Sequence, residues 1–373
     1  MPSPIQRMLA LARERFRVRP DDTGAPESET PDRAVDPGAD AEADAYASRI
    51  AHEQAVYAGQ TVVHDLPAIF HYWSNRYLRP RLEAFGFSHP EDFFLKYAAR
   101  TLRDRGSPGG AVLSIGSGNC DAEVRLAQGL REAGFDDFVI DCVDINPQML
   151  ERGRLLADEG GVARHIRAVA ADFNTLQLTR RYDVVVANQA LHHVMALEHL
   201  FDEVSAALPP HGRFLVSDMI GRNGHLRWPE ALTLVHALWA ELPEPKKYNH
   251  QLRRVEATFE DWDCSGASFE GIRAQDILPC LIPRFRFELF IGFINIVDVF
   301  IGRGFGPNFD ADSEADRAII DKVHAVDEAA LLAGRIKPTH AILVARSPAY
   351  AGETRVSMGL TPAKAVRDPA APP

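Results

Sequence analysis

Three histidines in this 373-residue chain are candidates for acid–base chemistry. His192 and His193 stand side by side in "NQALHHV", and His225 follows in "GRNGHLRW". An imidazole titrates near neutral pH, so it suits proton transfer to or from a bound substrate. We expect His193 to be the base, with His192 and His225 as the other candidates. The structural alternative is a histidine that caps the next helix or packs in the interior.

Further polar and glycine motifs follow apolar runs that predict buried strands. The runs are "AVLSIG", "DFVIDCVDI", "HIRAVAADF" and "YDVVVANQAL". The residues at or just after their ends are Gly116, Ser117, Gly118, Asp144, Ile145, Asp172, Phe173 and Asn188. The carboxyl ends of parallel strands share one edge of a sheet, and ligands bind there. These motifs therefore predict a ligand site.

The glycine loop restricts which ligand this site takes. It lacks the Gly-Lys-Ser/Thr ending of a phosphate-gripping loop, which excludes a nucleoside triphosphate site of that kind. A dinucleotide loop needs a third small residue at the start of its helix, and Asp121 stands there instead. Asp144 can accept hydrogen bonds from ribose hydroxyls. Dinucleotide-binding enzymes use an acidic residue in the same way, so Asp144 does not distinguish a dinucleotide from another adenosine-containing ligand. Asp172-Phe173 is placed to meet an adenine amino group and to cover the ring.

The strand candidates alternate with amphipathic segments, as in a doubly wound α/β sheet. Two later runs, "RFELFIGFINIV" and "HAILVAR", are further strands. The predicted helices cover residues 122–133, 146–158, 196–207, 229–241 and 315–334.

The ends of the chain differ in composition from its centre. Residues 1–17 have the pattern of a basic amphipathic helix, and residues 18–44 read as a disordered acidic linker. Residues 45–105 predict an N-terminal helical cap, and residues 349–373 a disordered tail. Within the cap, the aromatic stretch containing Tyr72 and Trp73 is a candidate substrate cover. Aromatic residues at helical spacing also occur in ordinary cores.

Composition excludes several partners. The net charge of −11 argues against a nucleic-acid substrate, and no apolar run is long enough for stable membrane insertion. The N-terminus lacks a secretory pattern, and the four cysteines form no CxxC pair, so we expect a cytoplasmic protein with reduced thiols. The His193 to His199 spacing lacks partner cysteines, and Asp218 lacks the further acids of a catechol-type metal site. We therefore expect no metal.

The motifs, in this order, resemble the class I S-adenosylmethionine-dependent methyltransferases, in particular bacterial small-molecule enzymes. The resemblance covers about residues 94–346 and implies a Rossmann-like seven-stranded sheet whose last strand is antiparallel. It implies a catalytic domain over 106–348, with a helical substrate-covering insertion at about 219–284. The residues that would bind S-adenosylmethionine are Gly116, Ser117 and Gly118 at its methionine part, Asp144 and Ile145 at its ribose, Asp172 and Phe173 at its adenine, and Asn188 at the methionine part or the substrate.

The expected reaction is methyl transfer to an oxygen, nitrogen or sulfur nucleophile of a small-molecule acceptor, with Arg222 as a candidate for binding an acidic group. An NAD(P)-dependent oxidoreductase shares the fold, but Asp121 and the later motifs argue against it. A methyltransferase with a protein substrate and a non-catalytic cofactor-binding protein are the remaining alternatives. The sequence leaves the acceptor and the oligomeric state open.

Overall fold

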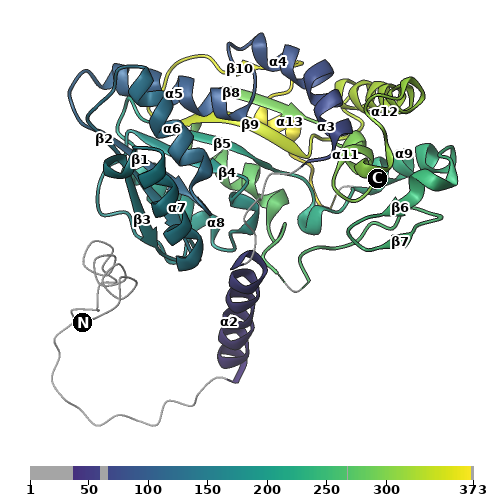
Figure 1. Ribbon diagram of the computed structural model, residues 1–373, viewed down its shortest axis with the longest axis horizontal. Helices are drawn as coiled ribbons and strands as arrows, with labels where there is room; N and C mark the ends of the chain where they lie inside the picture. The colour runs from purple at the N-terminus through teal and green to yellow at the C-terminus, as the bar shows by residue number, and fades with distance from the viewer. Residues whose placement is uncertain (1–36, 59–65, 267, 371–373) are drawn as a thin grey trace.

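The computed structural model describes residues 37–58, 66–266 and 268–370. Its central feature is an eight-stranded sheet in the order β10-β8-β9-β5-β4-β1-β2-β3 (Figure 1). The strands are β1 (Gly110–Ile115), β2 (Phe138–Asp144), β3 (Ile166–Ala170), β4 (Val184–Asn188), β5 (Arg213–Met219), β8 (Arg286–Phe293), β9 (His340–Arg346) and β10 (Arg355–Val356).

All neighbouring strands of this sheet pair in parallel except around β9, which is antiparallel to both β5 and β8. The seven-stranded arrangement with its inserted antiparallel strand is therefore confirmed. The short strand β10 extends it by pairing in parallel with β8.

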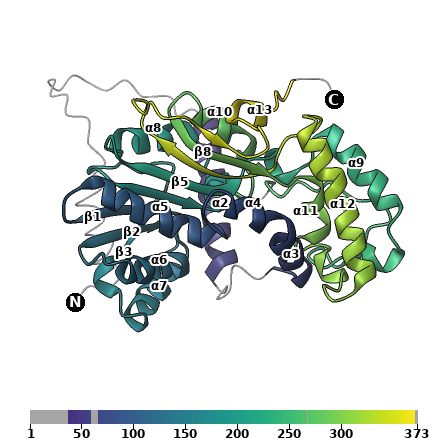
Figure 2. The ribbon, with the colours of Figure 1, turned by 90° about the horizontal axis from the view of Figure 1, so that it is seen from above.

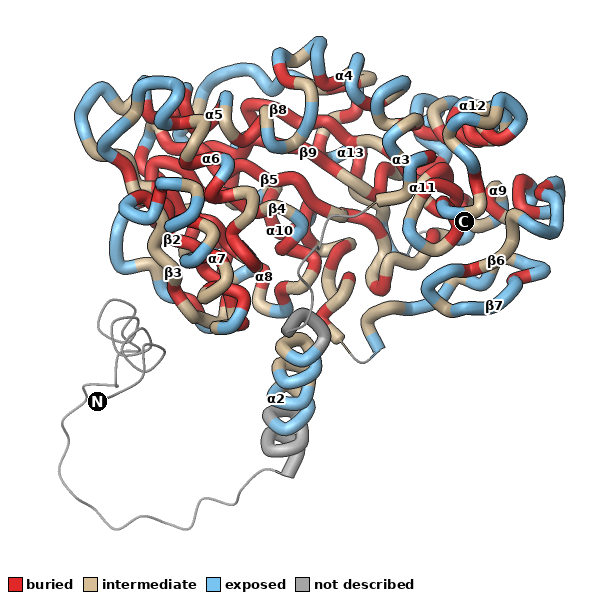
Figure 3. Tube along the Cα trace, in the orientation of Figure 1, coloured by how far each residue is buried: buried red, intermediate tan, exposed pale blue. Residues whose placement is uncertain are grey.

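Helices cover both faces of the sheet (Figure 2). One face carries α5 (Pro90–Arg105), α6 (Asp121–Glu132) and α7 (Pro147–Glu159), and the other carries α8 (Leu197–Ala207), α10 (Ile277–Leu281) and α13 (Pro362–Ala365). Alternate residues of a strand enter different cores: Val184 and Val186 pack on the first face, and Val185 and Ala187 on the second. Because both faces are buried, the strands are continuous apolar runs (Figure 3).

A helical extension lies beside the β8 end of the sheet (Figure 1). It contains α9 (Pro229–Ala240), α11 (Ile296–Ile301) and α12 (Glu314–Leu332), against which α3 (Ala68–Trp73) packs. A π-helical turn (Ser74–Leu78) and α4 (Arg79–Glu83) follow α3, and β6 (Tyr248–Asn249) pairs with β7 (Arg254–Val255) in a small hairpin. The insertion after β5 thus shares its core with the segment between β8 and β9.

Helix α2 (Pro37–Ala58) projects from the body of the molecule (Figure 1). Between residues 44 and 55 its half-buried positions are 46, 49, 50, 53 and 54. This spacing places them on one helical face. Among residues 44–55, only that face of the helix is half-buried.

Two predictions about the ends of the chain differ from the structure. The linker predicted over 18–44 overlaps α2, which begins at Pro37, while residues 1–36 lie outside the described part. The tail predicted over 349–373 is wrong as far as residue 370, because this segment forms β10 and α13 and buries Leu360 and Ala365. Its small apolar residues pack against β8 and α10 rather than forming a periodic pattern of their own.

No helix in the described part of the chain is long and apolar enough to cross a membrane.

Candidate active site

The glycine loop follows β1 and turns sharply toward the end of β2. The Gly116 and Ser117 amides donate to the Val143 carbonyl at 2.9 and 3.1 Å. Gly116 has φ +72°, and a Cβ added there would lie 2.5 Å from the Cβ of Ala190, which follows β4. Glycine is therefore required both by the backbone conformation and by the close approach of the two loops.

Asp144 ends β2 and fixes the glycine loop from the other side. Its Oδ2 accepts the Gly118 amide at 2.9 Å, and its Oδ1 accepts the Asn146 amide at 2.8 Å. Burial raises the pKa of Asp144, against the lowering effect of these two backbone donors. Asn146 in turn caps α7 by accepting the Gln148 amide at 3.0 Å.

Asp172 and Phe173 follow β3 as the sequence predicts. Asp172 is half-buried, and its Oδ2 accepts the Tyr46 hydroxyl of α2 at 2.5 Å. Asn174 completes the contact by donating to the Tyr46 oxygen at 2.8 Å. Phe173 is buried in the core beneath the second face of the sheet.

Helix α2 brings two more polar side chains to this edge of the sheet. The Gln54 side chain donates to the Ile145 carbonyl at 3.0 Å. The backbone carbonyl of Gln54 accepts the side-chain amide of Asn146 at 3.3 Å. Glu53 Oε1 lies 3.1 Å from Nδ1 of His193. The same helical face therefore reaches the residues after β2, β3 and β4.

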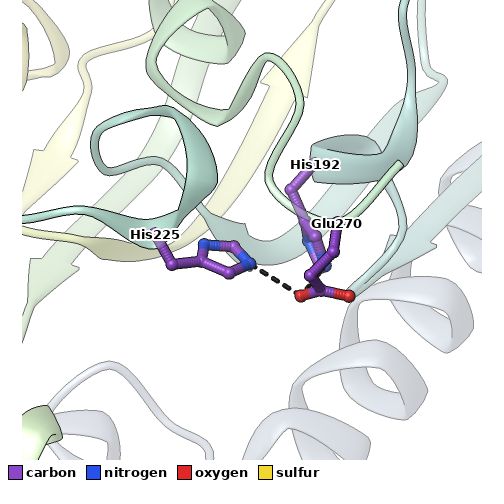
Figure 4. A group of neighbouring side chains, drawn as sticks. All are labelled: His192, His225 and Glu270. Carbon is purple, nitrogen blue, oxygen red and sulfur yellow. Dashed lines mark hydrogen bonds and ion pairs between the residues drawn. The ribbon is translucent and has the colours of Figure 1, made fainter. Parts of the chain in front are cut away.

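The three candidate histidines converge on one carboxylate, that of Glu270. Figure 4 shows this carboxylate with two of them, His192 and His225. His225 Nε2 lies 2.7 Å and His192 Nε2 3.5 Å from Glu270 Oε1. His193 Nε2 lies 3.5 Å from Oε2. These imidazoles come from the short 3₁₀ turns Leu191–His193 after β4 and Asn223–His225 after β5.

The electrostatics of this cluster follow from burial and pairing. Burial alone would lower the pKa of His192, but Asp218 and Glu270 raise it to about 10. Burial would raise the pKa of Glu270, but the hydrogen-bonded His192 and His225 hold it well below its usual range. These opposite shifts have one cause, the close packing of imidazole and carboxylate groups in the cluster.

Backbone hydrogen bonds hold the segments of the cluster together. The His192 carbonyl accepts the Ile272 amide at 3.1 Å, and the Gly271 carbonyl accepts the Gly224 amide at 2.9 Å. The segment containing Glu270 is thus bound to both histidine turns. Sequence reasoning missed Glu270, Glu53 and Tyr46, because each meets its partner across a long sequence separation.

Three predicted substrate residues make other contacts. Tyr72 donates to Asp321 of α12 at 2.9 Å, and the buried Trp73 donates to His324 of the same helix at 3.2 Å. Arg222 donates to the Arg227 carbonyl at 3.0 Å, and its guanidinium lies 5.2 Å from the Trp228 ring centre. These contacts attach the three side chains to the helical extension and the insertion rather than to the histidine cluster.

Asn188 lies at the end of β4, half-buried. With Glu123 of α6 it lines a cavity of about 200 Å³ beside α5. Because β4 pairs with β1, Asn188 lies next to the glycine loop that follows β1.

A family model described as a methyltransferase domain matches residues 107–265. Residues 107–265 are a methyltransferase domain. The matched range begins just before β1 and contains the glycine loop, the acidic strand ends and the three candidate histidines His192, His193 and His225. The match and the strand order thus agree that the part of the chain holding the glycine loop and the histidine turns is a methyltransferase domain.

Solved methyltransferase structures are similar to the chain at low identity. An O-methyltransferase from a Brevibacillus brevis trans-AT polyketide synthase multienzyme, in complex with S-adenosyl-L-homocysteine, is 12% identical with a TM-score of 0.40. This likeness covers 78% of the present chain and 83% of that one. Geranyl diphosphate C-methyltransferase from Streptomyces coelicolor A3(2) is also 12% identical, with a TM-score of 0.36, covering 66% and 77%. No curated protein matches the chain.

Proposed function

We propose that this methyltransferase acts on an oxygen, nitrogen or sulfur nucleophile of a small-molecule acceptor. The observation that carries the proposal is the position of His193 between Glu53 and Glu270, one turn after β4 and at the edge of the sheet that holds the glycine loop. A base at this place stands beside the expected methyl donor. The acidic net charge of the chain supports a small acceptor over a nucleic acid.

The proposed cofactor contacts come from the strand ends. Gly116, Ser117 and Gly118 would surround the methionine part, and Asn188 would lie at the methionine part or the acceptor. Asp144 and Ile145 would bind the ribose, and Asp172 with Phe173 the adenine. The approach of α2 to Ile145 and Asp172 supports this arrangement, because it encloses the same edge of the sheet.

The chemistry is an in-line displacement in which alignment supplies most of the acceleration. The acceptor's lone pair attacks the methyl carbon, the carbon–sulfur bond breaks, and the sulfonium becomes the neutral thioether of S-adenosylhomocysteine. For a hydroxyl acceptor, His193 takes the proton, and Glu53 stabilises the resulting imidazolium. A thioether acceptor has no proton to lose and would not need this base.

An enclosed site suits a small acceptor. Arg49 of α2 donates to the Ser265 carbonyl at 2.9 Å, so α2 contacts the insertion as well as the cofactor edge. The two additions therefore meet over the histidine cluster. The cytoplasmic location expected from the sequence stays a prediction, to be tested by fractionation of producing cells.

The proposal is tested by binding and by turnover. Calorimetric titration with S-adenosylhomocysteine should show binding to the wild type, and a screen of small acceptors with labelled methyl donor should then identify a product. With that acceptor, if it is a hydroxyl, His193→Ala should lower kcat by about 10²–10⁴-fold at unchanged cofactor affinity. His250→Ala, which changes an exposed histidine of the hairpin region, is the control. A kcat unchanged in His193→Ala contradicts the base assignment.

A further inference from the structure

The side chains of His192, His225 and Glu270 form a constellation that the methyl-transfer step does not itself require (Figure 4). One donor atom from each of the three side chains lies within 4.8 Å of the others. We propose that they are the ligands of a divalent first-row transition metal ion such as Zn²⁺, Fe²⁺ or Mn²⁺. Two imidazoles and one carboxylate on one side of an ion leave the remaining coordination positions open to substrate or water.

The donor set determines the class of metal. Imidazole nitrogen suits zinc, iron, copper and nickel, whereas Mg²⁺ and Ca²⁺ prefer sites built from oxygen. Ligand atoms of a tetrahedral zinc site lie about 3.3 Å apart, from metal–nitrogen distances of about 2.0–2.1 Å. His192 Nε2 and Glu270 Oε1 are already 3.5 Å apart, and His225 Nε2 is 2.7 Å from the same oxygen. Small side-chain rotations are enough to bring the three atoms to coordination distance.

His192 has the outer contact that metal-binding histidines typically have. Its Nδ1 lies 2.6 Å from Asp218 Oδ1, and this contact directs Nε2 toward Glu270. Asp218 is itself fixed, because its Oδ2 accepts the Ala190 and Leu191 amides at 2.8 Å each. A carboxylate behind the far nitrogen orients the ring and increases the basicity of the metal-binding nitrogen.

His225 is held in an unusual backbone conformation. Its φ is +57°, in the left-handed region that residues other than glycine adopt at some cost. The loop is kept there by the contact of Gly224 with Gly271: a Cβ on Gly271 would lie 3.1 Å from the Gly224 nitrogen and 3.1 Å from His225 Cε1. Strain of this kind is retained where the surrounding structure fixes a functional group. Here it directs the imidazole toward Glu270.

The position of the site gives the ion a role, and this part of the inference rests on the proposed function. His193 is the next residue after His192, so the ion would lie beside the proposed base. A metal ion there would bind an acceptor oxygen and lower the pKa of the acceptor hydroxyl. An acceptor with two oxygens on adjacent carbons would occupy two open positions of the ion. The metal would thereby select oxygen-rich chelating acceptors.

Metal binding is measurable without any acceptor. The full-length protein, stripped with a chelator and dialysed, is titrated with Zn²⁺ by calorimetry and with Co²⁺ by visible absorption. We expect one ion per chain and the d–d absorption of a site with nitrogen ligands. His225→Ala and Glu270→Gln should each weaken binding at least 100-fold. His250→Ala, a change to an exposed histidine, should leave it unchanged.

The outcomes separate the metal site from the proposed function. S-adenosylhomocysteine binding retained in His225→Ala shows that the variant is folded, so its loss of metal can be assigned to the lost ligand. Metal binding in a wild-type protein that does not bind S-adenosylhomocysteine would support the metal site and contradict the proposed function. Absence of metal binding to the wild type, or binding unaffected by both ligand variants, overturns the metal site.

Discussion

His192 Nδ1 and Asp218 Oδ1 lie 2.6 Å apart in the interior, where the two residues are 3% and 1% exposed. The pair joins the turn after β4 to the end of β5, and it fixes the ring that faces Glu270. Because both groups are shielded from water, their attraction is strong, and either one left alone would be a costly buried charge.

Replacement of Asp218 by Asn should therefore strongly destabilise the folded protein. We expect Asp218→Asn to lower the free energy of unfolding by about 3–5 kcal/mol, because it removes the buried carboxylate that holds His192 and accepts the Ala190 and Leu191 amides. Asp202→Asn breaks the exposed ion pair with Arg284 and is the matched control, expected to cost about 0–1 kcal/mol. Urea denaturation measures both. Equal, small losses in the two variants contradict the account of the buried pair.

The contact between the glycine loop and Ala190 predicts an asymmetry between two glycine substitutions. Gly116 and Gly134 both have positive φ, but an added Cβ meets Ala190 at the first position and open space at the second. Gly134→Ala should cost about 1–2 kcal/mol from backbone strain alone. Gly116→Ala should cost more, since the loops must also separate. Thermal denaturation of both variants makes the comparison, and a smaller loss in Gly116→Ala is the contrary result.

Helix α2 should contribute to cofactor affinity through Tyr46. The Tyr46 hydroxyl holds Asp172, so Tyr46→Phe loses a hydrogen bond worth about 1 kcal/mol and should weaken S-adenosylhomocysteine binding roughly fivefold. His52→Ala changes an exposed position of the same helix and should have no effect. Calorimetry on the two variants tests the proposal. Unchanged affinity in Tyr46→Phe shows that α2 does not assist the cofactor site.

Glu123 predicts a pH-dependent stability. It is buried behind the glycine loop with Ser114 donating to it at 2.6 Å, and burial raises its pKa to about 7. The unfolded chain ionises this group near its ordinary pKa, so the folded state binds the proton more tightly. The stability is fully present below that ordinary pKa and is lost as the pH rises through about 7.

Glu123→Gln should remove this loss, because the amide keeps a partner for Ser114 and does not ionise. Between pH 5 and pH 8 the wild type should lose on the order of 3 kcal/mol relative to the variant. Urea denaturation at the two pH values measures the difference between the proteins. Parallel pH dependence in both would show that Glu123 is not the responsible group.

The sheet was predictable because its strands are long apolar runs separated by amphipathic helices. The motifs after β1, β2, β3 and β4 were predictable for the same reason, since topology alone brings strand ends to one edge. Short, weakly patterned elements were not: β10 and α13 are ordered by packing against β8 and α10.

The histidine cluster was only half predictable. His192 and His193 follow a strand, and His225 follows the next one, so their proximity could be inferred. Glu270 lies in an irregular segment far along the chain, and no spacing connects it to them. The ligand set of the proposed metal site therefore could not be recognised from the sequence.

The aromatic stretch has contacts that no local pattern could predict. Tyr72 and Trp73 stand at helical spacing, which fits a substrate cover and a core equally well. The structure pairs them with Asp321 and His324 of α12. Their partners lie on a helix about 250 residues away in sequence, beyond the range of any local pattern.

We propose that S-adenosylmethionine binds at the edge of the sheet that holds Asp144. Calorimetric titration with S-adenosylhomocysteine tests it most directly, with NADH in parallel and with the variants Asp144→Ala and Asp144→Asn. The control is Asp136→Ala, an exposed position just before the same strand. We expect binding to the wild type and to Asp136→Ala, loss in Asp144→Ala, and at least a tenfold weakening in Asp144→Asn. Binding of NADH instead, or S-adenosylhomocysteine affinity unaffected by either change at Asp144, would contradict the account.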